Sequence, residues 1–375
     1  MSVTIGYASP KFVPRDSNPP KIVSPGKSYF IVKIHSAQID FSAPIWQQAQ
    51  RLVVTSSVSL NHPVLGTEPI RALQFSREVQ KKIPQKLGTS KNIIDFVPAI
   101  MNHVSISIDF IMDVQNQLAN LSGMINAGAF VASISLGPGA AVAAKTVSEI
   151  SNKLVSTFIP NPNQQKPMLQ FTGDFNIPAE NFRDGYYVIL GTNNPQNPLP
   201  AEGATLEVTD DGLLINGKPA CLSYIILDVF STGARTRDLN EGAVWDKKLK
   251  EAEGIADNIQ CDPTATIDEK NEAWAKCKSI LKDAQVILNN DDNYLRDEAN
   301  NIYRETMMSC YKKIFGENST LTKAARGSES KEYEALEISK EEDLDSSLNK
   351  YANDVAETKE LIQKISNKHS APDLQ

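Results

Sequence analysis

The spacing of apolar residues changes near Arg235 of the 375-residue chain. Before that point, short runs alternate between apolar and polar residues, as in Val104–Phe110 (VSISIDF). After it, apolar residues recur three or four positions apart. Side chains alternate across a strand but repeat every 3.6 residues around a helix, so the sequence predicts strands first and helices afterwards. We therefore expect an α+β chain, with an antiparallel β-sandwich domain at 1–235 and an α-helical bundle domain at 236–375.

The first domain contains about eight or nine short candidate strands separated by turn signals. Asp210-Asp211-Gly212 and Asn216-Gly217 lie between apolar runs, and such sequences are typical of β-hairpins. Cys221–Ser231 (CLSYIILDVFS) is a long apolar run, which indicates burial on both faces or a central place in the sheet. The pattern of strands resembles that of C2-like or immunoglobulin-like sandwiches. The likeness concerns the pattern alone and implies no function.

One carboxylate, Asp228, lies inside that last predicted strand, on the face it shares with Tyr224, Ile226 and Phe230. A carboxylate on an apolar face can be a catalytic acid with a shifted pKa. The commoner arrangement is pairing with a basic residue or a place at a sheet edge. Asp228 is therefore the one candidate for an enzymatic group, and no catalytic residue is assigned.

Charge is distributed unevenly between the two predicted domains. Residues 1–235 carry 18 Lys and Arg against 16 Asp and Glu, a balance of +2, and the remaining residues carry 20 against 29, a balance of -9. The sum is the net charge of -7. An acidic chain of this kind argues against binding nucleic acid through bulk electrostatics, which requires a basic face.

A stretch without charged residues, Val114–Ala144, interrupts the predicted strands. Leu118–Leu136 and Ala140–Phe158 have the composition of two helices, and Gly137-Pro138-Gly139 separates them. The second segment places charged residues on one side, as in an amphipathic helix. We expect a helical hairpin inserted into the sandwich at about 114–160.

Three roles are open for this insert: packing on the sheet as ordinary core, binding a partner, or entering a membrane. Its length reaches the roughly 20 residues that a bilayer span requires, but it is only moderately apolar. The residues expected to contact a partner or a membrane are the larger apolar ones of its first segment. They are Met124, Ile125, Phe130, Val131, Ile134 and Leu136.

The second domain has several apolar stripes at helical spacing, and Thr266 with Glu269 fits a capping box at the start of one helix. The longest stripe runs through the predicted final helix in steps of four and three, as in a coiled coil. Such stripes usually form the core of a bundle, but this one is the best candidate for contact with another chain. Its proposed interaction residues are Leu344, Leu348, Tyr351, Val355, Ile362 and Ile365.

The sequence contains none of the common catalytic, nucleotide-binding or metal-binding motifs considered next. The sequence has no P-loop, GxGxxG, HExxH or GxSxG motif, and its four cysteines form no CxxC pair. Its four histidines show no metal-ligand spacing on one helix. We therefore expect no metal and no cofactor, and the amino-terminal residues lack the apolar run of a secretory signal, which favours a cytoplasmic location.

These observations favour a non-enzymatic interaction or assembly protein. The helical bundle would mediate partner binding or oligomerisation, and the β-sandwich would serve as an adaptor. The alternative is a conditionally membrane-active effector, pore-forming or membrane-disrupting, that the bundle holds inactive. A third hypothesis is an enzyme with a site near Asp228. The expected partners are another protein or a second copy of the chain, with a membrane possible and nucleic acid excluded.

Overall fold

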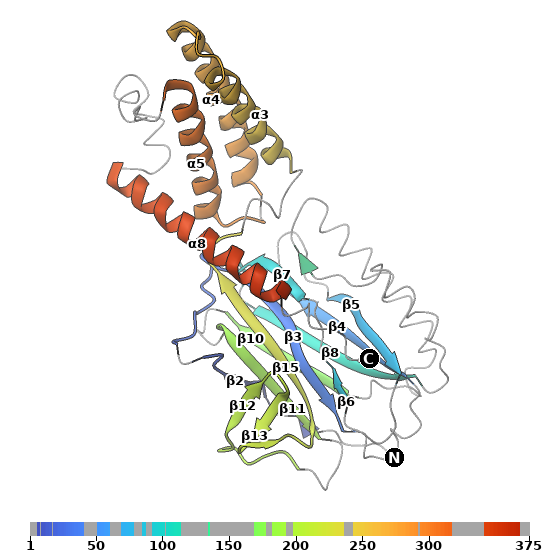
Figure 1. Ribbon diagram of the computed structural model, residues 1–375. Coiled ribbons are helices and arrows are strands. Elements are labelled where there is room, and N and C mark those ends of the chain that lie inside the picture. Colours follow the sequence, from blue (N-terminus) through green and yellow to red (C-terminus); the bar gives the residue numbers. More distant parts are fainter. Residues whose placement is uncertain are drawn as a thin grey trace. The chain divides into compact units, whose positions relative to one another are not determined.

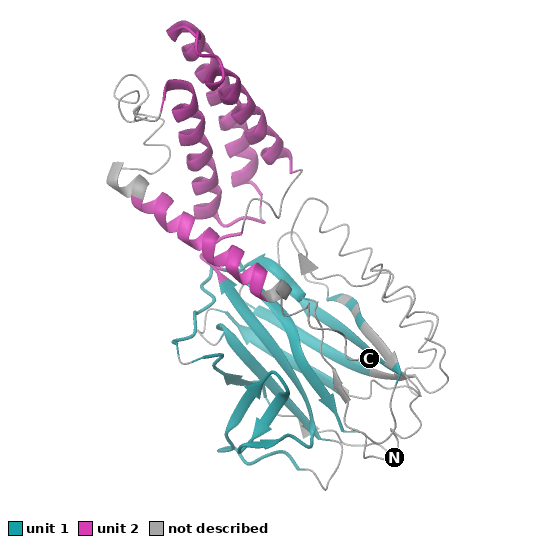
Figure 2. Cartoon of the chain, in the orientation of Figure 1, with its two compact units in different colours: residues 1–25, 29–231 teal, residues 26–28, 232–375 magenta. Residues whose placement is uncertain are grey.

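The chain divides into two compact units, one of residues 1–25 and 29–231 and one of residues 26–28 and 232–375 (Figure 2). We call them the sheet unit and the helical unit. The first holds antiparallel sheets and the second holds helices, so the predicted α+β order is confirmed. The computed structural model describes residues 6–7, 9–16, 18–40, 51–60, 69–78, 85–87, 92–101, 103–113, 134–135, 169–177, 182–192, 198–235, 243–291, 293–316 and 341–367.

The larger sheet of the sheet unit has the strand order β1-β11-β15-β3-β7-β9, with β2 also paired to β11 and β6 also paired to β3 (Figure 1). Its central strand is β15, although β15 comes last in the sequence among the strands of the unit. The strands are β1 (Gly6–Tyr7), β2 (Lys11–Val13), β3 (Tyr29–Ile39), β6 (Gln85–Leu87), β7 (Asn92–Pro98), β9 (Ile134–Ser135), β11 (Gly185–Thr192) and β15 (Ser223–Thr232).

A second sheet has the order β10-β8-β4-β5, and the two sheets contribute to one hydrophobic core. Ile225 and Leu227 of β15 and Ile106 and Ile108 of β8 are all fully buried in this core. A third sheet, β12-β13-β14, contributes to a separate apolar cluster with β11 and β15. These strands are β4 (Arg51–Ser59), β5 (Ile70–Glu78), β8 (His103–Asp113), β10 (Leu169–Asn176), β12 (Leu206–Thr209), β13 (Gly212–Ile215) and β14 (Lys218–Pro219).

Apolar alternation accounts for the strands that the sequence predicts most clearly. In β8, Val104 and Phe110 are fully buried while Ser105 and Ser107 are only half-buried. In β15 every residue is buried, as expected for a central strand with both faces covered. The Asn216-Gly217 turn has positive φ at both residues, 52° and 74°, which fits a type I′ hairpin.

The insert differs from its prediction where the structure describes it. Ile134–Ser135 forms β9, which pairs with β7 in parallel, so the predicted helix over Leu118–Leu136 is wrong at these two residues. Their backbone forms hydrogen bonds to a sheet edge, which a helix cannot do. The residues described show no inserted helical hairpin, and the rest of the predicted insert, 114–133 and 136–160, lies outside them.

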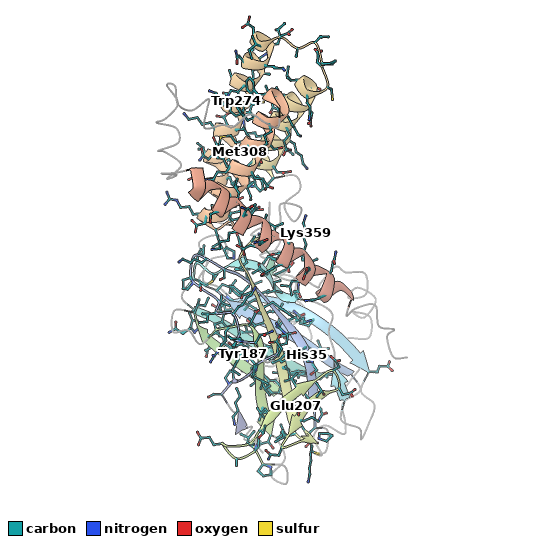
Figure 3. The ribbon with its side chains drawn as sticks, turned by 60° about the vertical axis from the view of Figure 1, so that its left-hand side comes forward. His35, Tyr187, Glu207, Trp274, Met308 and Lys359 are labelled. Atoms are coloured by element: carbon teal, nitrogen blue, oxygen red, sulfur yellow. The ribbon has the colours of Figure 1, made fainter. Side chains whose placement is uncertain are left out.

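The helical unit contains α3 (Val244–Gln260), α4 (Ile267–Asn289), α5 (Arg296–Phe315) and α8 (Glu341–Asn367). Its core includes Trp274, and the partly buried Met308 packs against this core (Figure 3). The capping box that starts α4 is present as predicted, because Thr266 accepts from the Glu269 backbone and Glu269 accepts from the Thr266 backbone. Among the helices described, none is both long and apolar enough to cross a membrane.

Candidate functional site

The candidate site lies on the face of the large sheet turned away from the shared core, which we call the outer face. In β3, Val32 and Ile34 belong to the core, so Lys33 and the half-buried His35 belong to the outer face. In β15, Asp228 alternates in the same way with Leu227 and Val229 of the core. The strand pairing places Asp228 directly opposite Tyr186 of β11.

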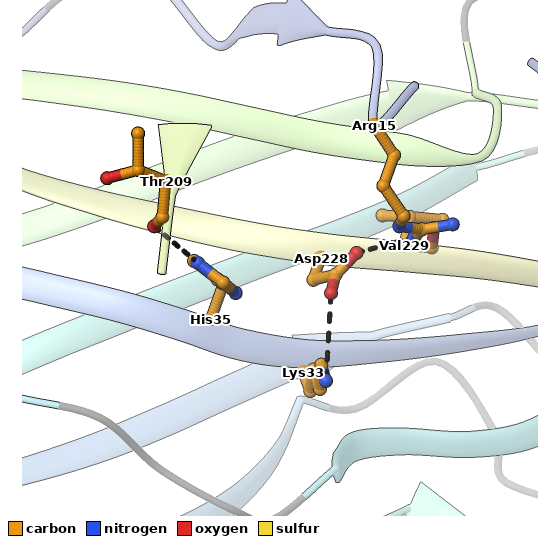
Figure 4. A network of polar contacts seen from close by, with 6 residues as sticks. All are labelled: Arg15, Lys33, His35, Thr209, Asp228 and Val229. Atoms are coloured by element: carbon orange, nitrogen blue, oxygen red, sulfur yellow. Dashed lines mark hydrogen bonds and ion pairs between the residues drawn. The ribbon is translucent and has the colours of Figure 1, made fainter. Parts of the chain in front are cut away.

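Asp228 is buried, and a cation binds each of its carboxylate oxygens (Figure 4). Arg15 Nη2 lies 2.5 Å from Oδ1, and Lys33 Nζ lies 3.6 Å from Oδ2. The same Arg15 nitrogen donates to the Val229 carbonyl oxygen at 2.7 Å. The commoner of the two arrangements considered for Asp228, pairing with a basic residue, is therefore the one observed.

Aromatic rings cover the cations of this cluster. The Arg15 guanidinium carbon lies 3.9 Å from the centre of the Phe230 ring and 5.7 Å from that of Tyr186. Lys33 Nζ lies 5.1 Å from the Phe230 ring centre. A guanidinium between a carboxylate and ring faces gains both charge-assisted hydrogen bonding and cation–π attraction. We call Asp228, Phe230 and Tyr186, together with Asp184, the arginine pocket.

Asp184 gives the pocket a second carboxyl group. Burial raises the pKa of Asp184 from 3.8 to about 6, although Arg15 acts in the opposite direction. Burial lowers the pKa of Arg15, but its attraction to Asp228 and its hydrogen bond outweigh that effect, so the pKa lies above the ordinary value. Burial and the nearby Asp228 also raise the pKa of Tyr186. Arg15 therefore stays charged, pairs with Asp228 and attracts the charge of Asp184.

Arg15 reaches the pocket from an extended segment along the edge of the large sheet. We call residues 6–7 and 9–16, which include β1 and β2, the arm. Its Phe12 packs edge to face on Tyr187, with ring centres 5.4 Å apart, and the Arg183 guanidinium carbon lies 4.5 Å from the Phe12 ring centre. At Gly185, where φ is +138°, an added Cβ would lie 2.7 Å from Phe12 Cε2. Only glycine leaves room for this ring, which makes a second binding position that we call the Gly185 cleft.

His35 lies beside the cluster and contacts the third sheet. Its Nε2 is 3.3 Å from the Thr209 carbonyl oxygen (Figure 4), and its ring centre is 5.0 Å from that of Tyr186. The contact with Thr209 ties the β12-β13 hairpin to the outer face, and the contact with Tyr186 lies within the large sheet. In the part of the chain that the structure describes, no group of three or more His, Cys, Asp and Glu side chains has the arrangement of a metal site.

The stripe predicted on the last helix is used within the helical unit along part of its length. Tyr351 is buried in the core of that unit, and Leu348 and Val355 are half-buried against it. Ile362 is half-buried but does not belong to that core. The side chains of Leu344 and Ile365 lie outside the described residues.

Of the predicted insert residues, the structure describes one. Ile134 lies in β9, opposite Ile94 of β7. The others, Met124, Ile125, Phe130, Val131 and Leu136, lie outside the described residues.

Sequence reasoning identified Asp228 but missed Arg15, Lys33 and Asp184. Lys33 carried a local signal, since it alternates with the apolar Val32 and Ile34. Arg15 gave no local signal, because its partner Asp228 lies 213 residues away. The chain matches no protein-family model and no curated protein, so the geometry of the site carries the functional argument.

Proposed function

We propose that the protein is a non-enzymatic interaction protein. Its sheet unit, a β-sandwich adaptor, recognises an extended segment that carries an aromatic residue and an arginine. Its helical unit mediates partner binding or oligomerisation. The arm is the segment that occupies this site within the chain.

One observation supports the proposal most directly. Arg15 is held by Asp228 and the Phe230 ring next to the edge of β11, where β2 pairs with that strand. Each oxygen of Asp228 already has a cationic partner, so the carboxylate is poorly arranged to exchange protons with a substrate. Beside it, β2 pairs with β11 through Lys11, Phe12 and Val13. Main-chain pairing at a sheet edge, with pockets for particular side chains, is how many domains recognise extended peptides.

In the helical unit, the proposed contact surface narrows to the end of α8. Tyr351 and its neighbours on the stripe pack within the unit, and Thr358 donates a hydrogen bond to the Ala234 carbonyl oxygen at 2.9 Å. Beyond Thr358, Ile362 continues the stripe without joining the core of the unit. A second chain could cover this side chain at little cost, since burying apolar surface is favourable.

The membrane-active alternative gains no support from the residues that the structure describes. The one described part of the uncharged stretch, β9, is paired to β7 at a sheet edge. Pairing in the sheet favours a structural or partner-binding role for the stretch over entry into a bilayer. We therefore propose one function only.

The test measures whether the site binds the arm sequence in trans. A labelled peptide of residues 6–16 is titrated against the full chain carrying Arg15→Ala, which weakens the hold of its own arm. We expect saturable binding by fluorescence anisotropy, tighter than to the unaltered chain, and at least tenfold weaker binding of the same peptide with alanine in place of its arginine. Phe12→Ala, which leaves the ion pairs in place, serves as a second receptor if the first unfolds. No difference between the two peptides on a folded receptor refutes the proposal.

A further inference from the structure

We propose that the arm exchanges between two copies of the chain, so that Phe12 and Arg15 of one copy fill the Gly185 cleft and the arginine pocket of the other. The inference rests on the proposed function, because it names the source of the recognised segment. The Gly185 cleft holds an aromatic ring and the arginine pocket holds a guanidinium. Every copy of the chain carries both side chains on its arm, so a second copy can fill both positions. Exchange of an identical element is a low-cost route to a dimer.

The arm is held by short strands, and its Phe12 and Val13 also pack against the apolar clusters of the sheet unit. Its strands pair with β11 at only a few positions, two in β1 and three in β2. An open surface pocket of about 390 Å³ lies between the arm and the segment that carries Glu202, Ala204 and Leu206. Close packing therefore supports the arm mainly along β11, and Phe12 and Arg15 supply its specific contacts.

A short hinge joins the arm to the rest of the sheet unit. After the arm, the chain is fixed again where the Asp184 backbone donates to the Lys21 carbonyl at 2.8 Å and the Val23 backbone donates to the Phe182 carbonyl at 3.0 Å. Between Asp16 and Lys21 lie Pro19 and Pro20. Consecutive prolines favour an extended chain, and the five Cα-to-Cα steps from Asp16 to Lys21 span up to roughly 17 Å. A short hinge of this kind favours passage of the arm to a neighbouring copy.

The arm covers an edge of β11 that would otherwise be unpaired. β11 is an apolar strand, GYYVILGT, and seven of its eight residues are buried. Leaving it unpaired would expose backbone hydrogen-bonding groups beside apolar side chains. In the closed form the arm binds its own chain, and in the exchanged form it makes the same contacts with a second copy. Because the contacts are the same, protein concentration decides between the two forms.

The strand register provides a direct test. Gly6 and Thr192 are paired residues, and paired residues of antiparallel strands have Cα atoms at a separation that a disulfide can bridge. We would prepare full chains with Gly6→Cys or Thr192→Cys alone, both with the exposed Cys221 and Cys261 changed to serine. The two chains are mixed, incubated and oxidised with oxidised glutathione, which accepts the two electrons and two protons of each disulfide formed.

We expect a covalent heterodimer whose yield rises with protein concentration. Because exchange keeps every contact of the arm, Arg15→Ala in the Gly6→Cys chain removes the same contacts from the closed and the exchanged forms. We therefore expect the heterodimer to form faster, with its final yield little changed. The chain with both cysteines is the control, because it forms the bond within one copy. If that control closes and the mixture gives no heterodimer at any concentration tested, the exchange is refuted.

The two proposals fail in different ways. A receptor that binds the arm peptide but gives no heterodimer refutes exchange and leaves the proposed function in place. A folded receptor that does not distinguish the arginine peptide from its alanine form refutes the recognition site itself.

Discussion

Changing Asp228 to asparagine tests whether the buried carboxylate holds the arm and the sheet together. The change keeps the size of the side chain but leaves Arg15 and Lys33 near a neutral amide. Removing one partner of a buried ion pair costs about 3 to 5 kcal/mol. The Arg15 side chain is 29% exposed, so solvent screens part of its share, whereas that of Lys33 is only 6% exposed. We therefore expect a loss of about 2 to 4 kcal/mol in the free energy of unfolding of the sheet unit.

The assay is urea unfolding of the full chain, followed by pulse proteolysis with mass spectrometry of the fragments from the sheet unit, because helices dominate the circular dichroism of the whole chain. The matched control is Asp174→Asn, which removes a carboxylate from a pair with His103 in the same unit, at 3.9 Å and with both side chains more than half exposed. An exposed pair is worth under about 1 kcal/mol, so the control is expected to unfold near the unaltered midpoint. Equal midpoints for the two variants would show that the Asp228 pair contributes nothing beyond a surface contact.

Three further changes examine the pH dependence, the cleft and the helical stripe. The pKa of Asp184 is about 6 in the folded chain and ordinarily 3.8, so its stabilising contribution is complete below about pH 4 and is lost as the pH rises through 6. We therefore compare the free energy of unfolding of Asp184→Asn with that of the unaltered chain, measured in urea at pH 4.5 and at pH 7.5. The difference between the two chains is expected to shift by about 1 to 3 kcal/mol in favour of the variant at the higher pH; an equal difference at both pH values contradicts this. Gly185→Ala is expected to displace Phe12, at a cost of about 1 to 3 kcal/mol, and to speed proteolysis within the arm; an unchanged cleavage rate contradicts the cleft. Tyr351→Ala is expected to destabilise the helical unit by about 2 to 4 kcal/mol, against under about 0.5 kcal/mol for the exposed neighbour Asn349→Ala, measured by tryptophan fluorescence; similar losses would place Tyr351 outside the core.

Local pattern was sufficient for the elements whose neighbours in space are also neighbours in sequence. The hairpin at Asn216-Gly217 and the capping box at Thr266 each depend on a few adjacent residues, and both are found as predicted. The alternation in β8 likewise marks its buried face. The sequence could thus predict the order of strands and helices and the buried character of β15.

The arm and β9 show where local pattern fails. The arm sequence contains two prolines and has no clear strand periodicity, yet β11 and Asp228 order it from a distance. At Ile134–Ser135, composition suggested a helix, but pairing with β7 determines the conformation. A segment of two or three residues has too little periodicity of its own, so its partner decides what it becomes.

The position of β15 has a consequence for synthesis on the ribosome. β15 joins β11 to β3 in the large sheet, yet it leaves the ribosome roughly 180 residues after β3, a delay of roughly 10 to 40 s at ordinary rates of translation. During that time the edge of β3 that pairs with β15 has no partner, and β11 itself is completed only about 30 residues before β15 begins. The exposed edge of β3 makes the nascent chain a substrate for chaperones. We expect release before Ser223 to yield aggregates, because the strand that closes the sheet has not yet been made.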